Sequence, residues 1–79
     1  MNNTLVSVLS DVFGLREDRI VPELSRDEVE SWDSLKQMDL VLSLEQEFGV
    51  TLEIQDIVKM DSVANIIEVL TSKGVDLGP

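Results

Sequence analysis

The sequence predicts an all-α domain, a small bundle of three main helices plus one short helix, with a long first loop. Apolar residues recur at three- and four-residue steps in separate segments, which is the period of helices packed on a core. The one segment that could pass for a strand has no second strand to pair with. The chain has 79 residues, of which 43% are hydrophobic and 28% charged, a globular composition. We therefore expect a single domain over residues 1–79.

The first helix is predicted over about residues 3–14. Its apolar residues fall on one helical face, and Gly14 stands where a helix C-terminal glycine belongs. The residues of this face are Leu5, Val8, Leu9, Val12 and Phe13.

A loop is predicted over residues 15–33, which is long for a compact domain. Spaced apolar residues indicate that the loop is pinned across the core, and a short helical turn fits near residues 26–30. The expected anchors are Leu15, Ile20, Val21, Leu24 and Val29.

The second helix, predicted over residues 34–48, has the clearest pattern. At 100° per residue its apolar side chains span an arc of roughly 220°, which is wider than one packing face needs. Leu35 and Leu42 lie at the edge of this arc, where a partner could reach them. Gly49 ends the helix. The arc consists of Leu35, Met38, Leu40, Val41, Leu42, Leu44 and Phe48.

The remaining chain predicts two more helices. Residues 50–52 are expected to be an extended connection, followed by a short helix over 54–59. Asp61 or Ser62 is expected to cap a last helix over 62–72, and residues 74–79 form a tail.

Composition excludes several functions. The formal net charge of −10 disfavours nucleic acid and anionic membranes and favours partners with basic patches. No apolar run is long enough to insert into a membrane, and residues 1–4 are not a basic signal segment. We expect a cytoplasmic monomer. Without histidine or cysteine the chain lacks the usual catalytic bases, thiol nucleophile and metal ligands, so we expect neither an enzyme nor a metal site.

Ser34 has two possible roles at the start of the second helix. Ser34-x-x-Gln37 fits a capping box, and Asp33 is itself a good N-cap, so either residue could serve only to satisfy free backbone N–H groups. Alternatively, the Ser34 hydroxyl is an attachment point for a group that reaches other proteins. The tripeptide Asp33-Ser34-Leu35 alone favours the cap.

The wider segment from Trp32 to Val50 resembles the recognition helix of the acyl carrier protein family, and the resemblance extends over essentially the whole chain. It implies that Ser34 carries 4′-phosphopantetheine, flanked by Asp33 and Leu35. In that family a phosphopantetheinyl transferase adds this cofactor from coenzyme A in the presence of Mg²⁺, through a phosphodiester. The arm would supply the thiol that this chain lacks, and its thioester would carry an acyl group between enzymes.

The resemblance also implies a docking face. Leu35, Asp39, Leu42 and Glu45 fall where the family's helix meets basic patches on synthases, transferases and ligases. Core packing is expected instead for Met38, Val41, Leu44 and Phe48, which could line a cleft for a short acyl chain.

Two residues depart from the pattern of carriers in fatty acid synthesis. Lys36 replaces a residue that is usually acidic, and Trp32 one that is usually small. Trp32 is similar to its counterpart in specialised stand-alone carriers and in D-alanyl or aminoacyl carriers. We therefore expect a carrier of acyl or aminoacyl groups in lipid or specialised metabolite biosynthesis. The alternative is an acidic helical adaptor in which Ser34 is only a cap.

Overall fold

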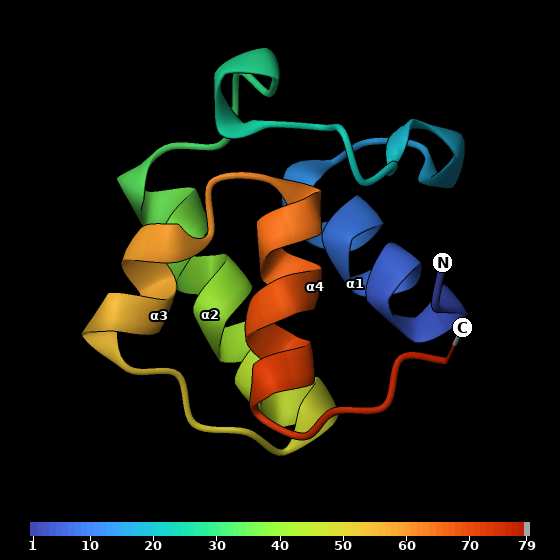
Figure 1. The fold of residues 1–79 in the computed structure, drawn as a ribbon. Coiled ribbons are helices and arrows are strands. Elements are labelled where there is room, and N and C mark those ends of the chain that lie inside the picture. The colour runs from blue at the N-terminus through green and yellow to red at the C-terminus, as the bar shows by residue number, and fades with distance from the viewer. Residues whose placement is uncertain (79) are drawn as a thin grey trace.

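The computed structural model describes residues 1–78 as a bundle of four α-helices and two short 3₁₀ turns. Helices α1, α2 and α4 pack around a shared core, and the short α3 lies beside α2 and α4 (Figure 1). No strand occurs in this part of the chain, which has one isolated bridge between Ser25 and Ser62. The predicted fold class is confirmed. The elements are α1 (Asn3–Phe13), η1 (Glu17–Arg19), η2 (Arg26–Glu28), α2 (Ser34–Phe48), α3 (Ile54–Lys59) and α4 (Val63–Ser72).

The helix ends follow local chemistry. Asn2 caps α1, because its side-chain oxygen accepts a hydrogen bond from the Leu5 backbone N–H at 3.0 Å. Gly14 and Gly49 end α1 and α2 with φ angles of 67° and 64°. This left-handed backbone is costly for residues with a Cβ.

The long loop between α1 and α2 is fixed to the start of α4. Val63 N–H donates to the Leu24 carbonyl at 2.9 Å, and Ala64 N–H donates to the Pro22 carbonyl at 3.0 Å. These carbonyls satisfy N–H groups that have no partner within α4 itself. The loop therefore caps a helix that is distant in sequence.

Most of the expected loop anchors point inward. Ile20, Leu24 and Val29 are buried, and Leu15 is partly buried against the core. Val21 is exposed, so its prediction as an anchor is wrong. The turn expected near residues 26–30 is η2, whereas η1 was not predicted.

The buried face of α2 is narrower than its apolar pattern. Leu40, Val41 and Leu44 are buried, and Phe48 packs on the core while partly exposed. The expectation that Met38 is a core residue is wrong, because its side chain is 51% exposed. Buried positions cover an arc of about 100°, and Met38 lies about 60° beyond its edge. The remaining apolar side chains of α2, those of Leu35, Met38 and Leu42, face solvent.

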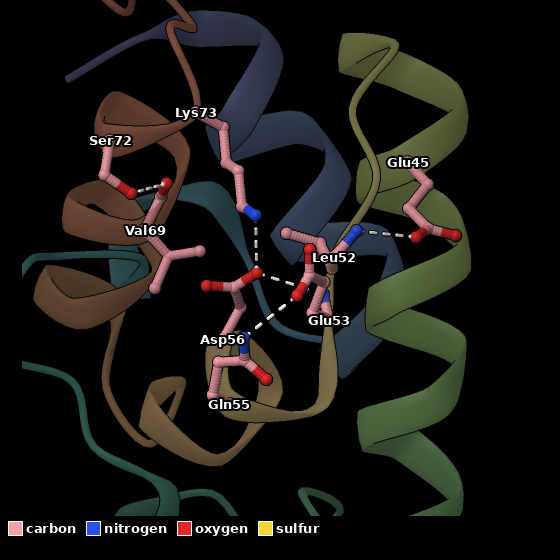
Figure 2. Close-up of polar contacts among 8 residues, drawn as sticks. All are labelled: Glu45, Leu52, Glu53, Gln55, Asp56, Val69, Ser72 and Lys73. Atoms are coloured by element: carbon pink, nitrogen blue, oxygen red, sulfur yellow. Dashed lines mark hydrogen bonds and ion pairs between the residues drawn. The ribbon is translucent and has the colours of Figure 1, made fainter.

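A polar clasp joins α3 to the end of α4. The Lys73 ammonium lies 2.7 Å from Asp56 Oδ2, and the same oxygen accepts a hydrogen bond from the Glu53 N–H (Figure 2). The hydrogen bond from Lys73 lowers the pKa of Asp56, and the hydrogen bond to Asp56 raises the pKa of Lys73. Short α3 is therefore fixed to α4 by a charged pair as well as by packing.

None of the helices within residues 1–78 has the length and apolar character needed to cross a membrane.

We predict that the clasp stabilises the fold in a pH-dependent way. The Asp56 pKa is lowered in the folded state, so its contribution is present above the ordinary Asp pKa of 3.8 and is lost as pH falls through the lower folded value. Because the Lys73 pKa is raised, its contribution is lost only as pH rises through a value above 10.5.

Asp56→Asn should therefore unfold at a lower urea concentration than the wild type at pH 7, and the difference should shrink below pH 3.8. Asp27→Asn, in η2, is the matched control. A difference that stayed constant down to the acid transition would contradict the prediction.

Candidate functional site

Asp33, the residue before Ser34, is the N-cap of α2. Its Oδ1 accepts a hydrogen bond from the Lys36 N–H at 2.8 Å, and its carbonyl accepts one from the Gln37 N–H at 2.8 Å. Of the two capping candidates in the sequence, the structure selects Asp33. The capping box Ser34-x-x-Gln37 does not form, because Ser34 is the first residue inside the helix and the Gln37 side chain is buried.

The Ser34 hydroxyl is exposed and available for chemistry. Within residues 1–78 it takes part in no hydrogen bond, and the backbone N–H groups of Ser34 and Leu35 have no acceptor there either. Unpaired N–H groups at a helix N-terminus, together with the positive end of the helix dipole, favour a negatively charged group. These features fit a phosphate ester on the Ser34 oxygen.

Trp32 is a buried residue that fixes the chain just before Asp33 and Ser34. Its side chain is 3% exposed, and its ring lies 4.5 Å from that of Phe13 at an angle of 34°. Arg26 Nε donates to the Trp32 carbonyl at 3.1 Å. These contacts tie the chain just before Ser34 to α1 and to the long loop.

Gln37 completes this support from inside the bundle. It is the one buried polar residue in residues 1–78, at 7% exposed. Its Oε1 accepts from Trp32 Nε1 at 2.6 Å, and its Nε2 donates to the carbonyls of Ile57 and Met60 at 3.0 and 3.2 Å. The amide therefore links the first turn of α2 to the end of α3. Removing it would leave buried polar groups unpaired, at about 1–3 kcal/mol each.

The outer face of α2 is apolar and acidic. Leu35 is 80% exposed and Leu42 is 55% exposed, with Asp39 exposed between them and Met38 alongside. These four residues form what we call the α2 face. Large exposed apolar side chains gathered on one helix face are typical of an interaction site.

Glu45 differs from the other predicted docking residues. It is partly buried, and its Oε2 accepts a hydrogen bond from the Leu52 N–H at 2.8 Å (Figure 2). One carboxylate oxygen therefore holds the connection after α2 in place.

Sequence reasoning missed two features of the site. One is the internal pairing of Trp32 with Gln37, for which the unusual tryptophan before Asp33 was the available signal. The other is a pair of apolar side chains on α3, Ile54 and Val58, which are both largely exposed. Their i, i+4 spacing places them on one face of α3.

The fold and the site together define a small helical domain with an exposed serine at the start of α2, the class to which small carrier proteins belong. The family model described as the phosphopantetheine attachment site matches residues 3–70. The chain belongs to the acyl carrier protein family.

Known members of the family agree with this assignment. The acyl carrier protein of Petrotoga mobilis is 32% identical over 66 residues, covering 84% of this chain and 78% of that protein. That of Thermosynechococcus vestitus is 28% identical over 67 residues, covering 85% and 83%. The solution NMR structure of the holo acyl carrier protein from Geobacter metallireducens has the same fold, with a TM-score of 0.79 at 24% identity. This match covers 90% of this chain and 82% of that one.

Family membership defines the chemistry in outline. The protein carries acyl groups on a covalently attached 4′-phosphopantetheine arm. Carriers of this family are non-catalytic and interact with synthases and transferases.

We predict that Asp33, and not Ser34, stabilises the start of α2. Asp33→Ala removes the acceptor for the Lys36 N–H and should cost about 0.5–2 kcal/mol of unfolding free energy. Ser34→Ala should stay within about 0.5 kcal/mol, because an exposed side chain without a partner contributes little.

Urea denaturation followed by circular dichroism checks both values. Asp33→Asn, which retains a capping oxygen, is the control and should lie close to the wild type. An equal loss of stability in Ser34→Ala and Asp33→Ala would overturn the assignment of the cap.

Proposed function

We propose that the Ser34 hydroxyl is the attachment point of the 4′-phosphopantetheine arm. One observation carries this proposal: Ser34 is exposed at the start of α2 while the neighbouring Asp33 performs the capping. The serine is therefore free to be modified without disturbing the helix. The adaptor alternative, in which Ser34 serves only as a cap, has no such support.

The attachment step is a phosphoryl transfer. In a phosphopantetheinyl transferase that uses Mg²⁺, the Ser34 oxygen bonds to the coenzyme A phosphorus nearest the pantetheine. The bond from that phosphorus to the pyrophosphate bridging oxygen breaks, and adenosine bisphosphate leaves with the electron pair. The serine proton passes to a base of the transferase. The N–H groups of Ser34 and Leu35 would then lie beside the charged phosphodiester and favour it.

The phosphopantetheine arm supplies the thiol that the chain lacks. Because the chain has no cysteine, the thiol that forms a thioester with the acyl or aminoacyl group belongs to the arm. The tether confines this group near the carrier, which raises its effective concentration at an enzyme docked on α2.

Partner docking is proposed on the α2 face around Leu35, Asp39 and Leu42. Exposed leucines give apolar contact, and Asp39 adds to a chain of net charge −10 that attracts basic surfaces. Glu45 contributes the carboxylate oxygen that is not bonded to Leu52, at the edge of the α2 face. The partners proposed are the phosphopantetheinyl transferase, acyl or aminoacyl ligases, synthases and acyltransferases with basic patches. The carrier acts as a monomer in the cytoplasm, in lipid or specialised metabolite biosynthesis.

Attachment is tested by incubating the protein with a phosphopantetheinyl transferase, Mg²⁺ and coenzyme A. The intact mass should increase by one phosphopantetheine, and Ser34→Ala should show no increase. Ser43→Ala, on the same helix, is the control and should be modified like the wild type. A wild type that stays unmodified, or a modified Ser34→Ala protein, would refute the assignment of Ser34.

Docking is tested by reversing one charge on the α2 face. Asp39→Lys should raise the KM of the transferase for this protein roughly five- to tenfold at low salt, with the difference shrinking as salt is added. Glu68→Lys, an equal change of charge at an exposed position on α4, should change KM far less. Equal effects of the two variants would indicate attraction by net charge alone and would contradict a localised docking face.

A further inference from the structure

We propose that Gln37 and Trp32 form a specificity-determining latch, which closes the bundle interior to the acyl group and keeps the cargo on the outside. We call this pair the Trp32–Gln37 latch. The inference rests on the proposed attachment of the arm at Ser34. It assigns the protein a cargo class, a short or polar acyl group that does not need apolar shelter.

The latch lies at the part of the interior nearest the arm. Gln37 follows Ser34 by three residues, which is a rise of about 4.5 Å along α2. Its amide donates to the carbonyls of Ile57 and Met60 at 3.0 and 3.2 Å. An acyl chain that entered the bundle between α2 and α3 beside the arm would have to separate Gln37 from these carbonyls.

The polar groups of the latch are fully paired. Leu40, three residues after Gln37 on α2, and Met60, whose carbonyl accepts from Gln37, are buried, and no buried side-chain nitrogen or oxygen within residues 1–78 lacks a hydrogen-bond partner. If the latch opened, the Met60 carbonyl and the Trp32 indole N–H would lose their partners, whereas the Ile57 carbonyl would keep the Met60 N–H at 3.1 Å. An alkyl chain cannot replace either lost hydrogen bond.

The surface near Ser34 offers a different kind of environment. A groove between α1 and α2 is open to solvent and lined by polar and apolar residues: Asp11 and Val12 of α1, and Lys36, Asp39, Leu42, Ser43 and Gln46 of α2. The α2 residues of this groove point about 100–180° away from Gln37 around the helix. A long alkyl chain in this open, partly polar groove would remain in contact with water, which disfavours it. Short or polar acyl groups carry no such penalty.

The test compares two cargoes on the same carrier. A phosphopantetheinyl transferase loads the wild type with acetyl or hexanoyl phosphopantetheine from the corresponding acyl coenzyme A, and intact mass verifies loading. Trp32 is the sole tryptophan, so its indole N–H gives a single NMR resonance that reports on the latch. Cleavage of the thioester by hydroxylamine reports on exposure of the acyl group.

In the wild type, the indole N–H resonance should be the same with either cargo, and the ratio of hexanoyl to acetyl cleavage rates should be the same as for free acyl pantetheine thioesters. In Gln37→Ala, the hexanoyl thioester should become protected by roughly tenfold, because the amide no longer blocks the interior. Gln46→Ala, an exposed glutamine on the same helix, should behave like the wild type.

Two results would overturn the proposal: protection of the hexanoyl group in the wild type, or no protection in a folded Gln37→Ala protein. If Gln37→Ala does not fold, Trp32→Phe takes its place, since it retains a ring against Phe13 but lacks the N–H donor. No protection in folded Trp32→Phe would then count against the latch. Failure to load any cargo would refute the attachment at Ser34 and is recognised separately by mass.

Discussion

The side-chain amide of Gln37 is the interaction on which the arrangement around Ser34 depends. Three parts of the fold meet at this group: the end of the long loop at Trp32, the first turn of α2, and, twenty or more positions further along the chain, the end of α3 at Ile57 and Met60. Apolar packing alone specifies which faces of these segments are buried but tolerates sliding and rotation. Directional hydrogen bonds inside a low-dielectric core are strict about geometry. The amide therefore fixes how α3 is placed beside the start of α2.

The free energies of hydrogen bonding and of apolar burial indicate why a buried amide can determine which acyl groups enter the bundle. Opening the latch leaves two buried groups unpaired, at about 1–3 kcal/mol each. Burial of an alkyl chain gains about 0.8 kcal/mol per methylene. Roughly three to eight methylenes would be needed to offset the lost hydrogen bonds, before any displaced core side chain is counted. Short acyl groups cannot supply that much, so for them the closed bundle is the stable state.

The helices could be predicted from the sequence because each has a regular apolar period and a clear end, as at Gly14 and Gly49. The Asp33-Ser34-Leu35 motif by itself favoured a helix cap, and only the resemblance of the wider segment from Trp32 to Val50 indicated a carrier protein. Met38 could not be placed correctly, because the apolar arc of α2 is wider than its buried face, and the boundary depends on where α1, α3 and α4 pack. The Trp32–Gln37 hydrogen bond was equally hidden, because a helix pattern does not distinguish an inward amide from a polar surface residue. The short η1 turn lacks any periodic signal.

The division of labour between Asp33 and Ser34 has a consequence for the energetics of modification. If a serine capped the helix through its own hydroxyl, esterification would break the cap, and the free energy of loading would include a penalty from the fold. Here the cap resides on the preceding carboxylate. The proposed attachment at Ser34 would therefore leave this cap intact, and the unmodified and modified carriers should share one scaffold. The arm can then be attached, loaded and unloaded without a change in the fold of the protein that bears it.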